Sequence, residues 1–184
     1  MSAIYTWWIG VDAPNPRVMA GVRARIEAAF EIPVVAWDAA LRPSDTLDVR
    51  RQQHHSTAIL RWLKMHRPPD ARKVVGLTDV DLFIPVLTFV YGEAQLGGRC
   101  AVVSTARLGL SPGGLDGDLA ASRLAKECIH ELGHTFGLVH CGSSRCVMSR
   151  SINLNAVDAK SSTFCNDCRL LYLERVSQVE ADHE

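Results

Sequence analysis

Residues 128–141, which read CIHELGHTFGLVHC, constrain this chain more than any other segment. If the segment begins as a helix, His130 and His134 stand four residues apart on one face, as two imidazoles that share a tetrahedral metal ion require. Gly137 can leave the helix in a left-handed conformation, which would turn the chain back and bring His140 to the same ion. The segment therefore predicts three nitrogen ligands with Glu131 beside them, and a fourth metal position left for water.

The order His-Glu-x-x-His carries a specific chemistry. Zinc lowers the pKa of a bound water towards about 7, and a neighbouring carboxylate accepts the proton as the water attacks a carbonyl group. Glu131 is the predicted general base and would later pass the proton to the leaving amine. The short pattern also arises by chance on amphipathic helices, but Gly137 and His140 extend it in register and favour the metal site.

Four of the six cysteines form a second pattern, Cys141-x4-Cys146 and, eighteen residues later, Cys165-x2-Cys168. Two such pairs suit a closed tetrahedral thiolate site, which holds zinc for structure and leaves no position for water. Two disulfides in an oxidising compartment are the alternative, which the lack of an export signal disfavours. Because Cys141 directly follows His140, a zinc at the cysteines would hold the backbone that positions the third histidine.

The other two cysteines, Cys100 in a strand-like run and Cys128 on the helix, are predicted to be small buried apolar residues. Adjacent histidines precede the second predicted helix. His54 and His55 are expected to face solvent and not to bind a metal.

The apolar periodicity predicts an α/β (α+β) chain. Strands are predicted at residues 4–11, 33–37, 74–79, 86–91 and 99–104. Helices are predicted at 16–30 behind an asparagine cap, at 56–66, from about Asp118 through the histidines, and at 167–179, with loops at 39–53 and 111–117. The first strand, helix and strand indicate a parallel crossover, and the fourth and fifth strands are close enough in sequence to pair antiparallel.

Composition excludes several classes of protein. Twenty basic and twenty acidic residues among 184 leave no net charge, so neither a nucleic-acid binder nor a membrane-surface protein is indicated. The apolar runs are shorter than the roughly 18 residues that a spanning helix needs, and no export signal precedes the first strand. We expect a soluble, cytoplasmic protein with one domain over residues 1–184, divided into an upper part, 1–137, and a lower part, 138–184.

The chain resembles the metzincin clan of zinc peptidases, because the extended histidine motif matches at every position and Met148 matches the methionine of the clan's Met-turn. More narrowly, it resembles the archaemetzincin family, in which four cysteines hold a second zinc beside the catalytic one. The cysteines that match are Cys141, Cys146, Cys165 and Cys168. Weaker likenesses lie at Arg51-x-Gln53 and at residues 89–92.

The resemblance implies a metzincin-like fold with a twisted mixed sheet of about five strands, one antiparallel edge strand, an active-site helix, a Met-turn and a C-terminal helix. It places residues 89–92 in the edge strand, where an extended peptide could add backbone hydrogen bonds. It also implies two zinc ions, one catalytic at His130, His134 and His140 and one structural at the four cysteines.

The leading hypothesis is a zinc-dependent metallopeptidase that hydrolyses peptide bonds in peptide or protein substrates. The alternative is a zinc-binding interaction or regulatory protein that keeps the fold and has little hydrolytic activity. The sequence dictates neither the substrate nor the oligomeric state.

Overall fold

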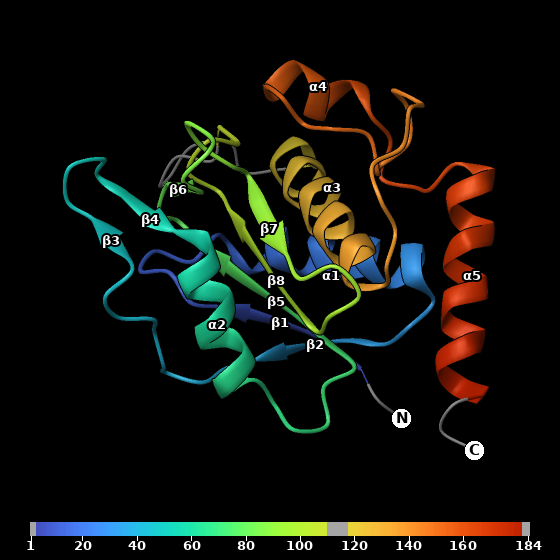
Figure 1. Ribbon diagram of the computed structural model, residues 1–184, viewed down its shortest axis with the longest axis horizontal. Helices are drawn as coiled ribbons and strands as arrows, with labels where there is room; N and C mark the ends of the chain where they lie inside the picture. The colour runs from blue at the N-terminus through green and yellow to red at the C-terminus, as the bar shows by residue number, and fades with distance from the viewer. Residues whose placement is uncertain (1–2, 110–117, 182–184) are drawn as a thin grey trace.

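A twisted five-stranded sheet organises the computed structural model, which describes residues 3–109 and 118–181 (Figure 1). The strand order is β2-β1-β5-β8-β7. The parallel strands are β1 (Ile4–Trp8), β2 (Val34–Trp37), β5 (Lys73–Thr78) and β8 (Cys100–Ser104), and β7 (Gly92–Ala94) pairs antiparallel with β8 at the edge. The predicted mixed sheet with one antiparallel edge strand is confirmed. The predicted loop at 111–117 lies outside the described residues.

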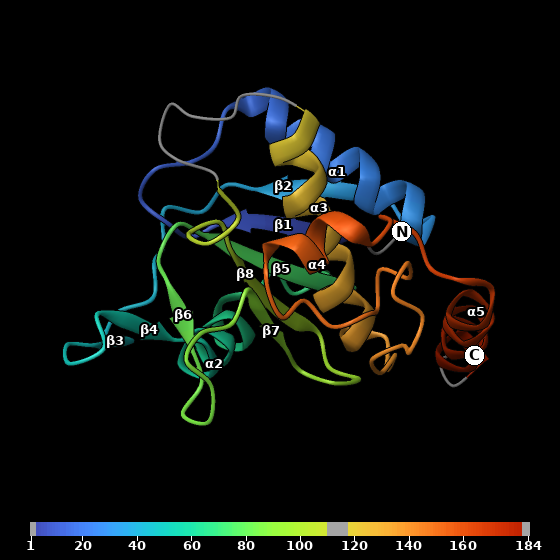
Figure 2. The same ribbon diagram turned by 90° about the horizontal axis from the view of Figure 1, so that it is seen from above.

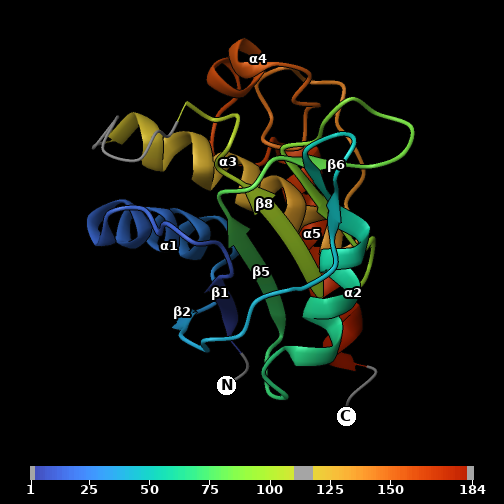
Figure 3. The same cartoon turned by 90° about the vertical axis from the view of Figure 1, so that its left-hand side faces the viewer.

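Helices cover both faces of the sheet. The helices α1 (Pro16–Phe30) and α3 (Asp118–Thr135) lie on one face and α2 (Ser56–His66) on the other, as Figure 3 shows with the sheet nearly edge-on. Alternate strand residues pack to opposite sides, since Val75 and Val103 join the core beneath α1 and α3, whereas Val74 and Val102 join the core beneath α2. Parallel strands buried on both faces explain the continuous apolar runs in the sequence.

The helix boundaries follow local signals. Asn15 caps α1 by accepting a hydrogen bond from the Arg17 amide at 2.9 Å, and Pro16 occupies the first turn, as predicted. The helix α2 spans the predicted residues, and α5 (Asn166–Ala181) confirms the predicted C-terminal helix. Figures 1 and 2 show α5 standing at one end of the molecule, beside the end of α1. The Tyr172 hydroxyl fastens it there by donating to the Phe30 carbonyl oxygen at 2.6 Å.

The edge strand differs from its predicted position. A strand was expected at residues 86–91, and the resemblance placed residues 89–92 in the edge strand. Residues 86–91 instead form a loop with an isolated bridge at Val90, and only Gly92 of these positions lies in β7. The Arg51 guanidinium donates to the carbonyl oxygens of Leu87 and Thr88 at 2.8 and 3.0 Å, which fixes this loop away from the main sheet. The Gln53 amide also donates to the Thr88 carbonyl, at 2.9 Å.

Two short features were not predicted. A small second sheet contains β3 (Leu47–Asp48), β4 (Gln53–His55) and β6 (Leu82–Phe83), and a helix α4 (Leu154–Ala159) follows the segment after His140. The expectation that His54 and His55 face solvent is wrong, because both are half-buried in β4. The His54 Nδ1 atom lies 2.8 Å from Thr46 Oγ1, and His55 packs edge-on against Phe83 with ring centroids 5.1 Å apart. None of the described helices combines the length and the apolar character that a membrane-spanning segment needs.

Candidate metal centres and active site

The two histidines of the first motif project from one face of α3. Their ring centroids lie 4.7 Å apart, and the Nε2 atoms of His130 and His134 are separated by 3.2 Å. Two nitrogens bound to one tetrahedral zinc at about 2.0–2.1 Å are about 3.3 Å apart, so this separation fits shared ligation. The helix has brought both nitrogens to one point, as the four-residue spacing predicts.

Backbone carbonyl groups orient both rings. The Nδ1 atom of His130 lies 2.8 Å from the Val147 carbonyl oxygen, and that of His134 lies 2.7 Å from the Leu138 carbonyl oxygen. A carbonyl oxygen only accepts, so each Nδ1 carries the proton and each Nε2 keeps its lone pair for a metal. Burial also lowers the pKa of both rings, which favours the neutral form that binds metals.

The third histidine reaches the same point through the turn at Gly137. This glycine has a φ of +87°, and its amide donates to the His134 carbonyl oxygen at 2.9 Å, so the helix ends in the left-handed turn that the sequence predicts. The His140 ring lies 5.3 Å from the His130 ring and 4.9 Å from the His134 ring, measured between centroids. One nitrogen from each histidine lies within 4.8 Å of the others, and the three rings fit one metal ion.

Glu131 lies in the floor of the same site and is almost completely buried. Burial raises the pKa of its carboxyl group, and the nearby Glu127 carboxylate raises it further. The edge strand approaches it closely at Gly92, where a Cβ atom would lie 2.7 Å from Glu131 Cγ and 2.6 Å from the Val102 carbonyl oxygen. A glycine at this position therefore permits the strand and the carboxylate to share the space.

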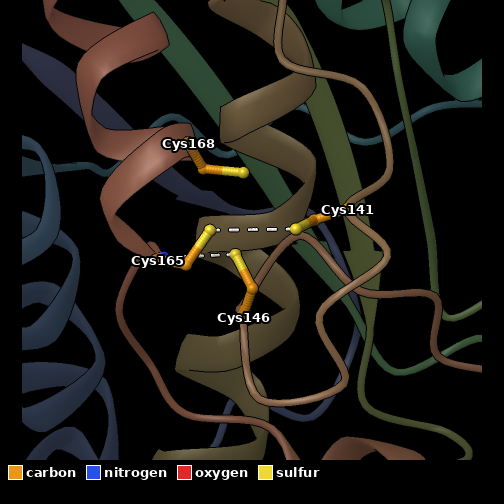
Figure 4. A group of neighbouring side chains, drawn as sticks. All are labelled: Cys141, Cys146, Cys165 and Cys168. Atoms are coloured by element: carbon orange, nitrogen blue, oxygen red, sulfur yellow. Dashed lines mark hydrogen bonds between the residues drawn. The ribbon is translucent and has the colours of Figure 1, made fainter.

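The four cysteines of the second motif point toward one another, as Figure 4 shows. Their sulfur atoms lie within 4.8 Å of one another, and the Sγ atoms of Cys141 and Cys165 are 3.8 Å apart. Sulfur atoms around a tetrahedral zinc with bonds of about 2.3 Å are separated by about 3.8 Å. All six cysteines are free thiols, so the structure does not support the alternative of two disulfides.

Backbone amides donate hydrogen bonds to two of the four cysteine sulfur atoms. The Ser143 amide donates to Cys141 Sγ at 3.4 Å and the Cys165 amide donates to Cys146 Sγ at 3.3 Å. A backbone hydrogen bond within the Cys165–Cys168 turn lowers the pKa of Cys165, which favours the thiolate that zinc binds. Cys100 and Cys128 are fully buried elsewhere, and burial raises the pKa of both, as expected of apolar packing residues.

A backbone hydrogen bond and a methionine connect the two clusters. The Cys141 amide donates to the Met148 carbonyl oxygen at 2.9 Å. The Met148 side chain is buried against α3, where a Cβ atom on Gly133 would lie 2.5 Å from its sulfur. Met148 therefore packs beneath the histidine cluster and makes a structural contact, with Gly133 providing the room.

A cavity of about 620 Å³ opens above the histidines. The loop before β7 and the strand itself form one wall, and residues 150–152 form the other. The residues that contact it near the cluster are Tyr91, Gly92, Glu127, His130, Glu131, His134, His140, Arg150, Ser151 and Ile152. Because β7 is the last strand of the sheet, its outer edge faces this cavity unpaired by the main sheet.

The sequence did not reveal Glu127, Ser151 and Lys160, which lie together beneath this cavity. Glu127 stands four residues before Glu131, so helical spacing places both carboxylates on the same face and was the available signal. Lys160 lies in a short polar segment, and no sequence pattern there indicated that it would contact Glu127.

The chain matches known proteins along most of its length. The model of peptidase family M54 matches residues 44–175. An archaemetzincin of Archaeoglobus fulgidus is 36% identical over 165 residues, which cover 90% of this chain and 95% of that protein. An archaemetzincin of Methanopyrus kandleri is 54% identical over 118 residues, which cover 64% of this chain and 65% of that protein. The crystal structure of the Methanopyrus protein has a TM-score of 0.84 at 35% identity, covering 96% of each chain.

The matched region includes both motifs and the walls of the cavity, and the architecture agrees over nearly the whole chain. The predicted resemblance is thereby confirmed. The chain belongs to peptidase family M54, the archaemetzincins, a family of zinc metallopeptidases.

Proposed function

We propose that this chain hydrolyses peptide bonds with one catalytic zinc at His130, His134 and His140, and with Glu131 as general base. The observation that carries the proposal is the convergence of three imidazoles at the base of an open cavity, with a buried carboxylate beside them. We further infer a second, structural zinc at Cys141, Cys146, Cys165 and Cys168, whose four thiols match a closed tetrahedral site.

A bound zinc supplies Lewis-acid chemistry, lowering the pKa of water and polarising a carbonyl group. The residues of the chain supply the proton transfers. The Glu131 carboxylate accepts a proton from the attacking water and then donates it to the nitrogen of the departing amine. Because burial raises the pKa of Glu131, its carboxylate is a stronger base than an exposed glutamate.

The edge strand offers a means of binding substrate. The strand β7 lines the cavity and, among the described strands of the main sheet, pairs with β8 alone, so an extended peptide can add a further strand along its outer edge. Backbone pairing of this kind suits peptide or protein substrates. The absence of net charge argues against a nucleic acid as the partner.

The test compares the wild type with Glu131→Gln and Glu131→Ala on a panel of peptides, with zinc content measured for each protein. We expect the wild type to cleave and both variants to lose at least about 10²-fold in kcat, because general-base catalysis contributes roughly that much. Zinc content should not change. Inactivity of the wild type at full zinc occupancy would favour the alternative of a zinc-binding regulatory protein, and full activity of Glu131→Gln would remove Glu131 from the mechanism.

A further inference from the structure

A buried ion pair lies beneath the cavity and has no part in the proposed proton transfers. Lys160 Nζ lies 2.8 Å from Glu127 Oε1, and the two side chains are 0% and 1% exposed. Ser151 joins them, since its hydroxyl donates to the same Glu127 oxygen at 2.8 Å and accepts from Lys160 Nζ at 2.6 Å. Ser151 and Lys160, nine residues apart after the histidine motif, thus meet Glu127 of α3 in one group of polar side chains.

The Lys160–Glu127 ion pair is not needed to hold α4 against α3. Arg123 already binds Asp158 with two hydrogen bonds of 2.7 and 2.6 Å, and Lys126 donates to the Val157 and Asp158 carbonyl oxygens. Removing two charges from water costs several kcal/mol, and well-packed apolar residues can often replace a buried ion pair without loss of stability. A role connected with the cavity is therefore the more economical explanation for the pair.

The position of Glu127 supports such a role. It lies one helical turn before Glu131 and lines the cavity together with His130 and Ser151. Its Oε1 atom pairs with the Lys160 ammonium and accepts a hydrogen bond from the Ser151 hydroxyl. Among the described residues, no hydrogen bond is donated to Oε2. The lining of the cavity also includes the apolar residues Val90 and Ile152, so apolar surface lies in the same cavity as the polar groups of Glu127, Ser151 and Glu131.

We propose that Glu127, Lys160 and Ser151 form the floor of a side-chain subsite that selects a neutral hydrogen-bond donor, such as a carboxamide. The inference rests on the proposed function, because it assigns the subsite beside the proposed catalytic metal. A carboxamide gives Oε2 a donor, whereas an apolar side chain covers that oxygen and leaves it unpaired. A cationic side chain is disfavoured because Lys160 already neutralises the carboxylate and repels a second positive charge.

The test uses three amino acid hydroxamates, which chelate zinc and differ mainly in the end of the side chain: those of glutamine, methionine and lysine. Their affinities for the zinc-loaded protein are measured by calorimetry, with acetohydroxamate as a reference that lacks a side chain. We expect the affinity of glutamine hydroxamate to be at least about tenfold higher than that of either of the other two side-chain hydroxamates. In the double variant Glu127→Met/Lys160→Met, methionine hydroxamate should bind most tightly.

The matched control is Lys126→Met. This change removes a buried lysine that lies beside Glu127 on α3 and does not line the cavity. It should keep the wild-type order of affinities. If the double variant does not fold, Glu127→Gln serves instead and should reduce the preference for glutamine hydroxamate, since a charged acceptor becomes a neutral one.

An unchanged order of affinities in the variants, or a preference for methionine hydroxamate in the wild type, would overturn the proposed subsite and leave the proposed function standing. Failure of acetohydroxamate to bind at full zinc content would overturn the proposed catalytic centre and this inference with it.

Discussion

Gly92 lies where the edge strand β7 comes closest to the proposed base. A methyl group there would meet the Glu131 side chain and the Val102 carbonyl oxygen at distances of 2.7 and 2.6 Å, well inside van der Waals contact. Either the carboxylate or the strand must then move. Both displacements affect the active site, because β7 lines the cavity and Glu131 lies at its floor.

We therefore predict that Gly92→Ala lowers kcat by about 10²-fold, the loss typical of a 1 Å displacement of a reacting group. Zinc content should remain at the wild-type level, because the atoms nearest to an added Cβ belong to Val102 and Glu131 and not to the proposed histidine ligands. The control is Gly142→Ala, since a Cβ atom at Gly142 meets no other atom within 4 Å. Equal kinetics for Gly92→Ala and the wild type would show that Glu131 tolerates displacement.

The residues of the proposed sites fall into two groups according to how they can be predicted. The histidines, Glu131 and the cysteines follow from short spacings that a helix or a turn converts directly into geometry. Glu127 and Lys160 are 33 residues apart and meet only because α4 folds back over α3, so no local pattern encodes their contact.

The short helix α4 depends on its contacts with α3. It has only six residues, too few to be stable alone, and Asp158 near its end accepts the two hydrogen bonds from Arg123. The Arg123 guanidinium lowers the pKa of Asp158 below its usual value of about 3.9. An acid whose pKa is lower in the folded state adds stability at pH values above its unfolded pKa, and this stability is lost as the pH falls through the folded pKa.

We predict that Asp158→Asn lowers the free energy of unfolding by about 0.5–1 kcal/mol at pH 7, a small amount because the carboxylate is partly exposed. The difference from the wild type should shrink as the pH falls below about 4. Urea denaturation of both proteins at pH 7 and near pH 3.5, in the same zinc-free buffer, measures it. A difference that stays constant with pH would show that the ion pair does not contribute.

Helices and strands whose boundaries depend on nearby residues were predicted well, whereas those positioned by residues distant in the sequence were not. The cap at Asn15 and the apolar spacing of α1 lie within the helix itself. The edge strand was displaced because Arg51 and Gln53, more than 30 residues away, hold the preceding loop. The helix α4 was missed because six residues are too few for a periodic pattern.

At the scale of the whole molecule, the cavity lies between two parts of the chain. The wall formed by β7 belongs to the sheet, and the wall formed by residues 150–152 follows the histidine motif. The backbone that bears His140 continues directly into the cysteine site, which also holds the start of α5 through Cys168. The position of the third histidine therefore depends on how the C-terminal segment is fixed to the rest of the fold.

We predict that Cys168→Ser weakens retention of the proposed catalytic zinc by about 10–100-fold as well as that of the proposed structural zinc, the range typical when groups that orient a metal ligand are lost. Loss of the thiolate frees the Cys141 backbone, and His140 moves with it because the two residues are adjacent. Zinc per chain is measured after dialysis against chelators of graded affinity. The control is Cys100→Ser, which alters a buried thiol in the central sheet and should lower stability without selective metal loss. Loss of one zinc from Cys168→Ser with the other held as tightly as in the wild type would show that the two centres are independent.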